Sequence, residues 1–347
     1  MWSNLTTLEC TQVYLIIAQL KCPVFFEQGL ETDKKKSIKI CIYAIFFVLL
    51  CPNLEENMTE LVKRSLSGAV FVGCVVGSIL WNPYVCCGLF FIICLLAIDE
   101  FNRLMQSPRA LRMFSLLATI ALWLVVFCFA WRNPEEEREY FSIGFIMSIA
   151  YLPIVVITLL DEIWNHSGDP LKSWGNFLIS QVMIALPLAT LMLLYFLDKW
   201  LLLALFVLIW VNDTGAYCVG SLTAKRKNGN HKMIPHVSPK KSWEGLFGGF
   251  AFTIGAAFLL HRFGWFDEIV VGQYGKLIAA LFGFLVSAFG TLGDLMESLM
   301  KRAIGVKDSG NFLPGHGGVL DRFDSILLAA PIVTALSYIC YFLVPLF

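Results

Sequence analysis

Charged residues are scarce in this sequence, and their scarcity excludes an ordinary water-soluble protein. Of the 347 residues, 15% are charged, 58% are hydrophobic and 14% are aromatic. A soluble domain usually carries about a quarter charged residues, and the mean hydropathy of +0.71 departs in the same direction. Metal-type Cys-x-x-Cys pairs are also lacking, and the 11 cysteines are scattered, most of them through apolar segments. We interpret them as small apolar residues.

The beginning of the sequence does not have the pattern expected of a signal peptide. The apolar run 13–20 has no basic residue before it and no small-residue cleavage site after it. Residues 1–57 are therefore treated as an N-terminal extension of open role. Their short apolar run 38–51 is compatible with an extra span, an interfacial helix, or a translated leader ahead of a true start at Met58.

Long apolar runs, by contrast, are abundant. A membrane-spanning helix needs about 20 mostly apolar residues, because the hydrocarbon core is roughly 30 Å thick. The sequence predicts an all-α polytopic membrane protein with no soluble domain, formed by residues 58–347. About nine spans are expected, near 66–81, 84–98, 112–131, 141–160, 176–197, 200–213, 244–261, 275–292 and 326–345.

The basic residues indicate how the spans are oriented. The net charge is zero, with 26 basic and 26 acidic residues, so only their distribution is informative. Most of the Lys and Arg residues from position 58 onward fall on one side if the segment before the first span is cytoplasmic. Cytoplasmic loops of membrane proteins are enriched in Lys and Arg. We therefore expect the long charged loops 213–243 and 293–325 to lie in the cytoplasm.

The first polar stretch begins where the apolar run 200–213 reaches Asp213. A carboxylate at membrane depth costs about 2.5–3.5 kcal/mol on insertion scales, so Asp213 either faces a polar cavity or marks the end of the span. Lys240 and Lys241 follow Pro239 just before a helix start. Their ammonium groups suit a phosphate ligand, although basic loops also set topology and attract anionic lipids.

A second polar stretch has the period of a helix. Polar side chains at i, i+3, i+4, i+7 and i+8 share one face, and here they are Asp294, Glu297, Ser298, Lys301 and Arg302. The nearby Lys307 and Asp308 are polar as well. Salt bridging on an exposed cytoplasmic loop would explain such a stripe without any ligand, and the spacing from Asp294 to Lys301 permits it.

The last span starts with the same spacing, since Asp321 and Asp324 are three residues apart. The residues before them, 314–318, are too rich in glycine for a helix and predict a tight loop. Two carboxylate-bearing helices joined by such a loop can hold Mg²⁺, a hard cation that prefers oxygen ligands. Arg322 then adds positive charge for a polyphosphate. His316 either contacts the ligand or hydrogen-bonds within the loop.

The whole stretch resembles the signature of bacterial phosphatidate cytidylyltransferases, also called CDP-diacylglycerol synthases. The matching residues run as Ser298-Leu-Met-Lys301-Arg302, four residues, Lys307-Asp308-Ser-Gly310, two residues, then Leu313-Pro314-Gly315-His316-Gly317-Gly318-Val-Leu-Asp321-Arg322-Phe-Asp324. Segments 213–217 and 238–245 resemble the same family. Residues 1–57 have no counterpart in its pattern, and the loop 221–235 is longer than usual.

The resemblance implies the reaction of CTP with phosphatidate to give CDP-diacylglycerol and pyrophosphate. It also implies a Mg²⁺-dependent site with one or two metal ions. By matching positions, Asp294 and Asp321 would ligate the metal and act in catalysis together with Ser298 and Lys301. The substrate-binding residues expected are Asp213, Lys240, Lys241, Arg302, Lys307, Asp308, His316, Arg322 and Asp324.

The expected partners are CTP, phosphatidate, membrane lipids and a second copy of the chain in a homodimer, with no nucleic acid. The expected location is the bacterial inner membrane, with the active site on the cytoplasmic side. Two other functions stay open. A CTP-dependent lipid kinase of the polyprenol or phytol type would use similar loops but transfer a γ-phosphate. An ion-coupled transporter would use the same aspartates, but the gathering of charges on one side argues against it.

Overall fold

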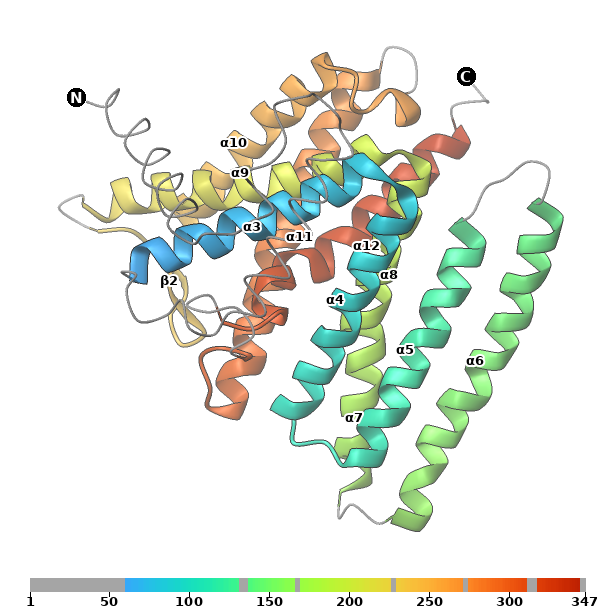
Figure 1. The fold of residues 1–347 in the computed structure, drawn as a ribbon. Helices are drawn as coiled ribbons and strands as arrows, with labels where there is room; N and C mark the ends of the chain where they lie inside the picture. Colours follow the sequence, from blue (N-terminus) through green and yellow to red (C-terminus); the bar gives the residue numbers. More distant parts are fainter. Residues whose placement is uncertain are drawn as a thin grey trace, which may run out of the picture.

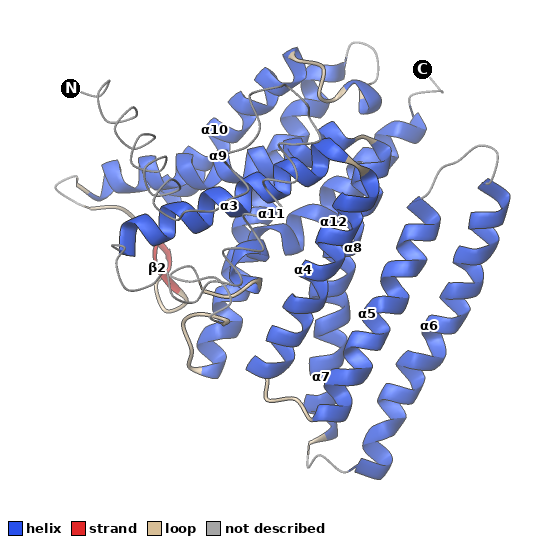
Figure 2. Cartoon of the chain, in the orientation of Figure 1, coloured by secondary structure: helices blue, strands red, loops and turns tan. Residues whose placement is uncertain are grey.

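The computed structural model describes residues 60–130, 137–165, 169–225, 229–270, 274–310 and 317–343, and these are almost entirely helical (Figures 1 and 2). The first half comprises α3 (Glu60–Trp81), α4 (Pro83–Leu104), α5 (Arg109–Ala130), α6 (Glu137–Asn165), α7 (Pro170–Ile179), the π-helical turn η3 (Ser180–Ala185) and α8 (Leu186–Leu197). The second half comprises α9 (Lys199–Ala224), α10 (Trp243–Arg262), the 3₁₀ turn η4 (Asp267–Ile269), α11 (Gly275–Ile304) and α12 (Leu320–Leu343).

The prediction of an all-α polytopic membrane protein is confirmed. Within the described residues, seven helices are long and apolar enough to cross a membrane, and Ser67–Trp81 is a shorter apolar helix. Each of the nine predicted spans overlaps a helix, while the number of crossings stays a prediction. The proposed extension 1–57 lies outside the described residues.

Two helices are longer than the predicted spans, and this corrects the boundaries of both charged loops. The run 200–213 continues as α9 to Ala224, and the run 275–292 continues as α11 to Ile304. The polar side chains in these two helices do not end them, because other side chains hydrogen-bond or pair with them. What ends α11 is Gly305, which adopts the left-handed conformation at φ 80° that glycine tolerates best.

A short antiparallel hairpin, β1 (Lys232–Ile234) and β2 (Ser238–Ser242), occupies the rest of the predicted loop 213–243 and is an exception to the all-helical prediction (Figure 2). The hairpin leads directly into α10. Ser242 at its end caps that helix, because its Oγ accepts a hydrogen bond from the Gly245 amide at 3.1 Å. The β2 strand is thereby held at a defined position beside α10.

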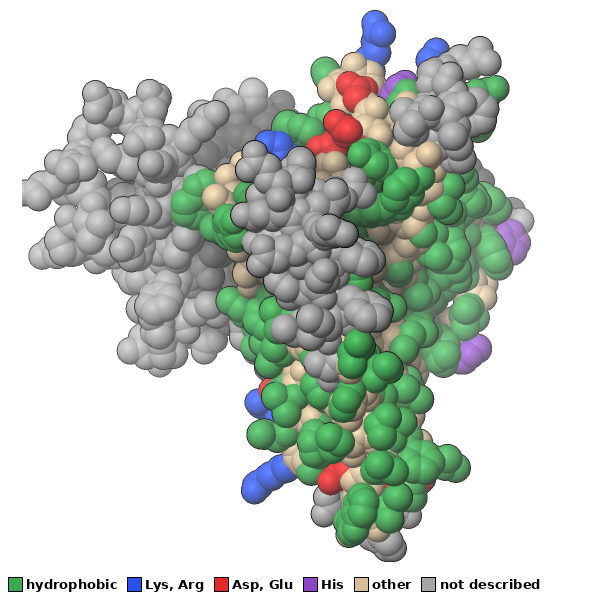
Figure 3. Space-filling model, turned by 90° about the vertical axis from the view of Figure 1, so that its right-hand side faces the viewer, with side chains coloured by type: hydrophobic (Ala, Val, Ile, Leu, Met, Phe, Trp, Pro, Cys, Tyr) green, Lys and Arg blue, Asp and Glu red, His purple; other side chains and the backbone are tan. Residues whose placement is uncertain are grey.

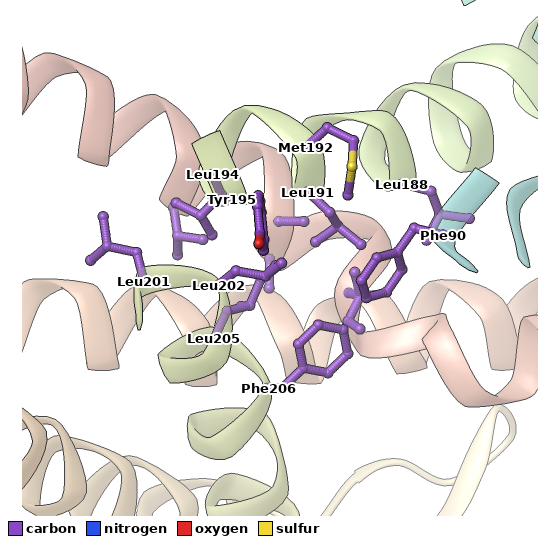
Figure 4. Close-up of a cluster of buried hydrophobic side chains, with 14 of the residues drawn as sticks. Phe90, Leu188, Leu191, Met192, Leu194, Tyr195, Leu201, Leu202, Leu205 and Phe206 are labelled. Carbon is purple, nitrogen blue, oxygen red and sulfur yellow. The ribbon is translucent and has the colours of Figure 1, made fainter. Parts of the chain in front are cut away.

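The helices form two groups that meet at α8 (Figure 1). One group contains α4, α5, α6 and α8, and the other contains α3, α9, α10, α11 and α12. The α7–α8 segment is the most buried of the candidate spans, with 67% of its apolar window inside the protein. Figure 4 shows the core where the groups meet. There Phe90 of α4 stacks on Phe206 of α9 at a ring-centroid distance of 5.7 Å, beside Leu188 and Leu191 of α8.

Glycines allow two helix pairs to approach closely. A Cβ atom on Gly248 of α10 would lie 2.5 Å from the Val219 side chain of α9, and one on Gly249 would lie 2.5 Å from Asn212 Oδ1. Between α11 and α12, a Cβ on Gly293 would lie 2.5 Å from the Asp324 carbonyl oxygen. Small residues at such crossings are typical of membrane helices, and these crossings bring the acidic residues of α9, α11 and α12 together.

The outer surface agrees with a lipid environment. Apolar side chains cover much of the described face in Figure 3, and many large ones are well exposed, including Trp164 and Leu171 at 76% each. An exposed apolar area this wide would be unfavourable in water. The described part of the chain is therefore a membrane protein.

Candidate active site

A cavity of about 350 Å³ lies among α3, α9, α11 and α12. One part of its wall is apolar or small and comes mainly from α3 and α9. The other part carries four carboxyl groups and one guanidinium from α9, α11 and α12. The lining residues of this second part are Asp213, Asp294, Asp321, Arg322 and Asp324. The cavity can therefore receive a ligand that has both an apolar portion and a charged portion.

Three of these carboxylates interact with one another electrostatically, and Lys241 is a cation that interacts with all three. They are Asp213 of α9, Asp294 of α11 and Asp324 of α12. Lys241 Nζ lies 2.7 Å from Asp294 Oδ2 and donates to the Thr291 carbonyl at 3.3 Å. One lysine faces three carboxyl groups, so this end of the cavity favours an additional cation or proton.

Buried polar contacts hold this acidic cluster in position. Ser298 Oγ donates to Asp294 Oδ1 at 3.2 Å, one helical turn away on α11. Beneath the cluster, Ser287 Oγ donates to Asn212 Oδ1, and Asn212 directly precedes Asp213. Gly293 keeps α11 close to the α12 backbone at Asp324. The carboxylate positions thus depend on the helix crossings rather than on loops.

A second cluster surrounds Lys301, whose ammonium group lies between two carboxylates. Lys301 Nζ is 2.5 Å from Glu297 Oε2 and 2.6 Å from Asp321 Oδ1. Glu297 has no exposed surface, and Lys301 is 8% exposed. Because removing a charge from water costs several kcal/mol, this lysine is held where it is by its two partners. Together they join α11 to the first turn of α12.

Asp321 also organises the polypeptide that leads into α12. Its Oδ2 accepts hydrogen bonds from the amides of Ser309 at 3.0 Å and Gly318 at 2.9 Å. Gly317 lies at φ 85°, a conformation that favours glycine, and a Cβ there would meet Asp321 Oδ2 at 2.6 Å. The glycines of this stretch therefore allow backbone amides to reach a carboxylate.

Comparison with known proteins identifies the family. The model of the cytidylyltransferase family matches residues 62–340. The chain belongs to this family. Among similar proteins, a phosphatidate cytidylyltransferase of Haemophilus influenzae is 29% identical over 302 residues, covering 81% of this chain and 98% of the relative. One from Staphylococcus epidermidis is 30% identical over 252 residues, covering 71% and 87%. One from Pseudomonas aeruginosa is 43% identical over 150 residues, covering 42% and 52%.

Most of the site residues predicted for this cytidylyltransferase lie together. Asp213, Asp294, Asp321, Arg322 and Asp324 line the cavity. Three others contact these aspartates: Lys241 and Ser298 bind Asp294, and Lys301 binds Asp321. The predicted roles of these residues stay predictions, but the structure brings their side chains to one place from segments far apart in the sequence.

Several predicted residues lie elsewhere. Lys240 is exposed, whereas the next residue of β2, Lys241, is half-buried. Arg302 is exposed, and its Nη1 donates to the carbonyl of Val306, two residues beyond the end of α11, at 2.9 Å. Lys307 and Asp308 are exposed. His316 lies outside the described residues.

The alternative of exposed salt bridges along α11 is wrong for the inner residues of the stripe. Lys301 pairs with buried Glu297 and with Asp321, while Asp294 pairs with Lys241 of the hairpin. Two of these ion pairs, Lys301–Asp321 and Asp294–Lys241, therefore connect α11 to other elements. The sequence could not reveal this, because helical spacing alone does not say which face of α11 the neighbouring helices cover.

Sequence reasoning missed Glu100. Its side chain, at the end of α4, accepts hydrogen bonds from the Val319 amide at 2.8 Å and the Leu320 amide at 3.2 Å. The only signal in the sequence is an acidic residue that follows an apolar run, the same signal that singled out Asp213. Nothing local indicates that its partners lie more than 200 residues away.

Proposed function

We propose that this chain transfers the cytidylyl group of CTP to phosphatidate, giving CDP-diacylglycerol and pyrophosphate. Membership of the cytidylyltransferase family and the names of its relatives support this. The observation that carries the proposal is the cavity, whose apolar wall adjoins four carboxylates. The acyl chains of a lipid phosphate suit the apolar wall, and its anionic headgroup would approach the carboxylates through a bound cation.

In this reaction a phosphate oxygen of phosphatidate attacks the α-phosphorus of CTP. The new P–O bond forms as the bond between the α-phosphorus and the oxygen that bridges to the β-phosphate breaks. Pyrophosphate leaves with the electron pair of the broken bond. No proton needs to be removed, because a phosphate monoester is already anionic at neutral pH. Arg322 lines the cavity, and Lys241 and Lys301 pair with the lining residues Asp294 and Asp321. We assign to these three cations the role of holding the phosphates and offsetting their charges.

The residues present fit Mg²⁺. Four carboxylates supply oxygen atoms, the ligand that Mg²⁺ prefers. In the described residues no three His, Cys, Asp or Glu side chains converge as a complete metal cage. Mg²⁺ usually binds through one or two carboxylates and completes its shell with water and substrate phosphates. We propose Asp294 and Asp321 as its ligands, and the bound ion would supply charge neutralisation to the phosphates.

The proposed setting is the bacterial inner membrane, with the cavity on the cytoplasmic side, where CTP is available. The distribution of basic residues supports this orientation. The homodimer expected from the family resemblance is also a proposal. Cross-linking of the chain in its native membrane tests it, and only monomer at every cross-linker concentration would contradict it.

The decisive experiment uses purified chain, phosphatidate in detergent micelles, Mg²⁺, and CTP labelled in either the α- or the γ-phosphate. We expect label from α-labelled CTP in the lipid and none from γ-labelled CTP. A lipid kinase would give the opposite result. Asp294→Asn and Asp321→Asn should each abolish incorporation while keeping a wild-type elution profile. Full activity in both variants would refute the metal assignment.

A further inference from the structure

The strongest unassigned feature outside the cavity is the carboxylate of Glu100, which reaches from the end of α4 to the start of α12. Its Oε2 accepts the Val319 amide at 2.8 Å, and its Oε1 accepts the Leu320 amide at 3.2 Å and the Ser309 hydroxyl. A single side chain thus binds Ser309 and the two residues at the start of α12, Val319 and Leu320.

Glycines at this point leave the space that Glu100 fills. A Cβ on Gly318 would lie 1.9 Å from Glu100 Oε1, and a Cβ on Gly310 would lie 2.9 Å from Glu100 Cδ. Real Cβ atoms do not approach other atoms so closely, so any larger residue at Gly318 would displace the carboxylate. Two glycines of the sequence signature, Gly310 and Gly318, are therefore explained by a glutamate that lies far outside that signature.

Glu100 and Asp321 both bind Ser309 and amides of residues 318–320. Ser309 donates its hydroxyl to Glu100 and its amide to Asp321. Gly318 donates its amide to Asp321, while the next two amides go to Glu100. The amides at the beginning of a helix lack partners within the helix, and a carboxylate there is stabilising. Glu100 supplies that carboxylate for the Val319 and Leu320 amides, while Asp321 accepts the Ser309 and Gly318 amides through Oδ2 and binds Lys301 through Oδ1.

We propose that Glu100 is a positioning residue for the cytidylyl transfer. It fixes the first turn of α12 and thereby the orientation of Asp321, without itself lining the cavity. This inference rests on the proposed function. It extends that function because it adds α4, which contributes no residue to the cavity lining, to the elements that determine the geometry of the site.

The test compares Glu100→Gln with Asp99→Asn. Glutamine keeps the size of the side chain but places an NH₂ group against an N–H donor. Asp99 is the adjacent carboxylate, which pairs with Arg103 and Arg112 instead. For Glu100→Gln we expect kcat to fall at least about tenfold and the Mg²⁺ concentration for half-maximal rate to rise. In Asp99→Asn both quantities should stay within about twofold of wild type.

Hydrogen exchange supplies a readout that does not depend on activity. In Glu100→Gln the Val319 and Leu320 amides should exchange at least about tenfold faster, because they lose their charged acceptor. The double variant Glu100→Gln with Ser309→Ala should lose less free energy of unfolding than the sum of the losses in the two single variants. Unchanged exchange would overturn the contact. If the amides exchange faster but each folded molecule keeps the wild-type kcat and Mg²⁺ dependence, the positioning role is overturned. If wild-type protein incorporates no label, the proposed function fails, and exchange still tests the contact.

Discussion

Replacing Lys301 with methionine is expected to destabilise the fold as well as stop the reaction. At an effective dielectric constant of about 20, unit charges 2.6 Å apart attract by about 6 kcal/mol. The desolvation of the buried groups offsets part of this attraction. Removing one member of a buried ion pair costs about 3–5 kcal/mol, because the remaining charge has no partner. Lys301 has two such partners, Glu297 and Asp321, so the upper part of that range is expected.

A second variant separates stability from chemistry. Glu297→Gln combined with Lys301→Met removes the buried negative charge along with the positive one. Asp321 keeps the Ser309 and Gly318 amides as donors. We expect the double variant to recover about half or more of the lost stability. Its activity should stay lost, because Asp321 has lost its ion-pair partner Lys301.

The assay is thermal unfolding of each variant in the same detergent, followed by incorporation of α-labelled CTP into lipid. Lys276→Met, an exposed lysine in the first turn of α11, is the matched control and should change the free energy of unfolding by less than about 0.5 kcal/mol. The reasoning is refuted if Lys301→Met unfolds like Lys276→Met, or if the double variant is less stable than Lys301→Met alone.

Three further outcomes are expected. Gly293→Ala should lower the free energy of unfolding by about 1–3 kcal/mol and reduce the rate, because its Cβ would meet the α12 backbone. Gly77→Ala, which has open space around it, should change neither quantity when unfolding and activity are measured. Lys241→Met should reduce the rate at least about tenfold, because Asp294 loses its ion-pair partner. Lys240→Met, at an exposed position, should keep the rate within about threefold of wild type. Equal losses of rate would contradict the assigned orientation of β2. EDTA should abolish label incorporation and excess Mg²⁺ should restore it, and full activity in EDTA would contradict a metal requirement.

The sequence by itself determined the class of the protein. Long apolar runs with few charges predict membrane helices, because lipid leaves the backbone polar groups no partner outside a helix. It also placed Asp294 on a helix, and Asp321 and Asp324 at the start of the last span. The spacing of Asp294, Ser298 and Lys301 predicted a shared face, since that periodicity is local.

Which of those polar residues meet was decided only by the tertiary structure. Arg302 belongs to the same periodic stripe as Lys301, yet Lys301 is buried between two carboxylates while Arg302 is exposed and donates to the Val306 carbonyl. The difference arises because α12 covers one part of the α11 surface and not the other. The periodicity of a sequence indicates which residues share a face of a helix, but not which element packs against that face.

Glu100 shows the same limit over a longer distance. Nothing near it in the sequence distinguishes it from a residue that ends a span, and its partners Ser309, Val319 and Leu320 come from the other end of the chain. Only the packing of α4 beside α12 places its carboxylate at their amides. Local sequence determines which residues can be helical and charged, and packing across the chain determines which charges act together.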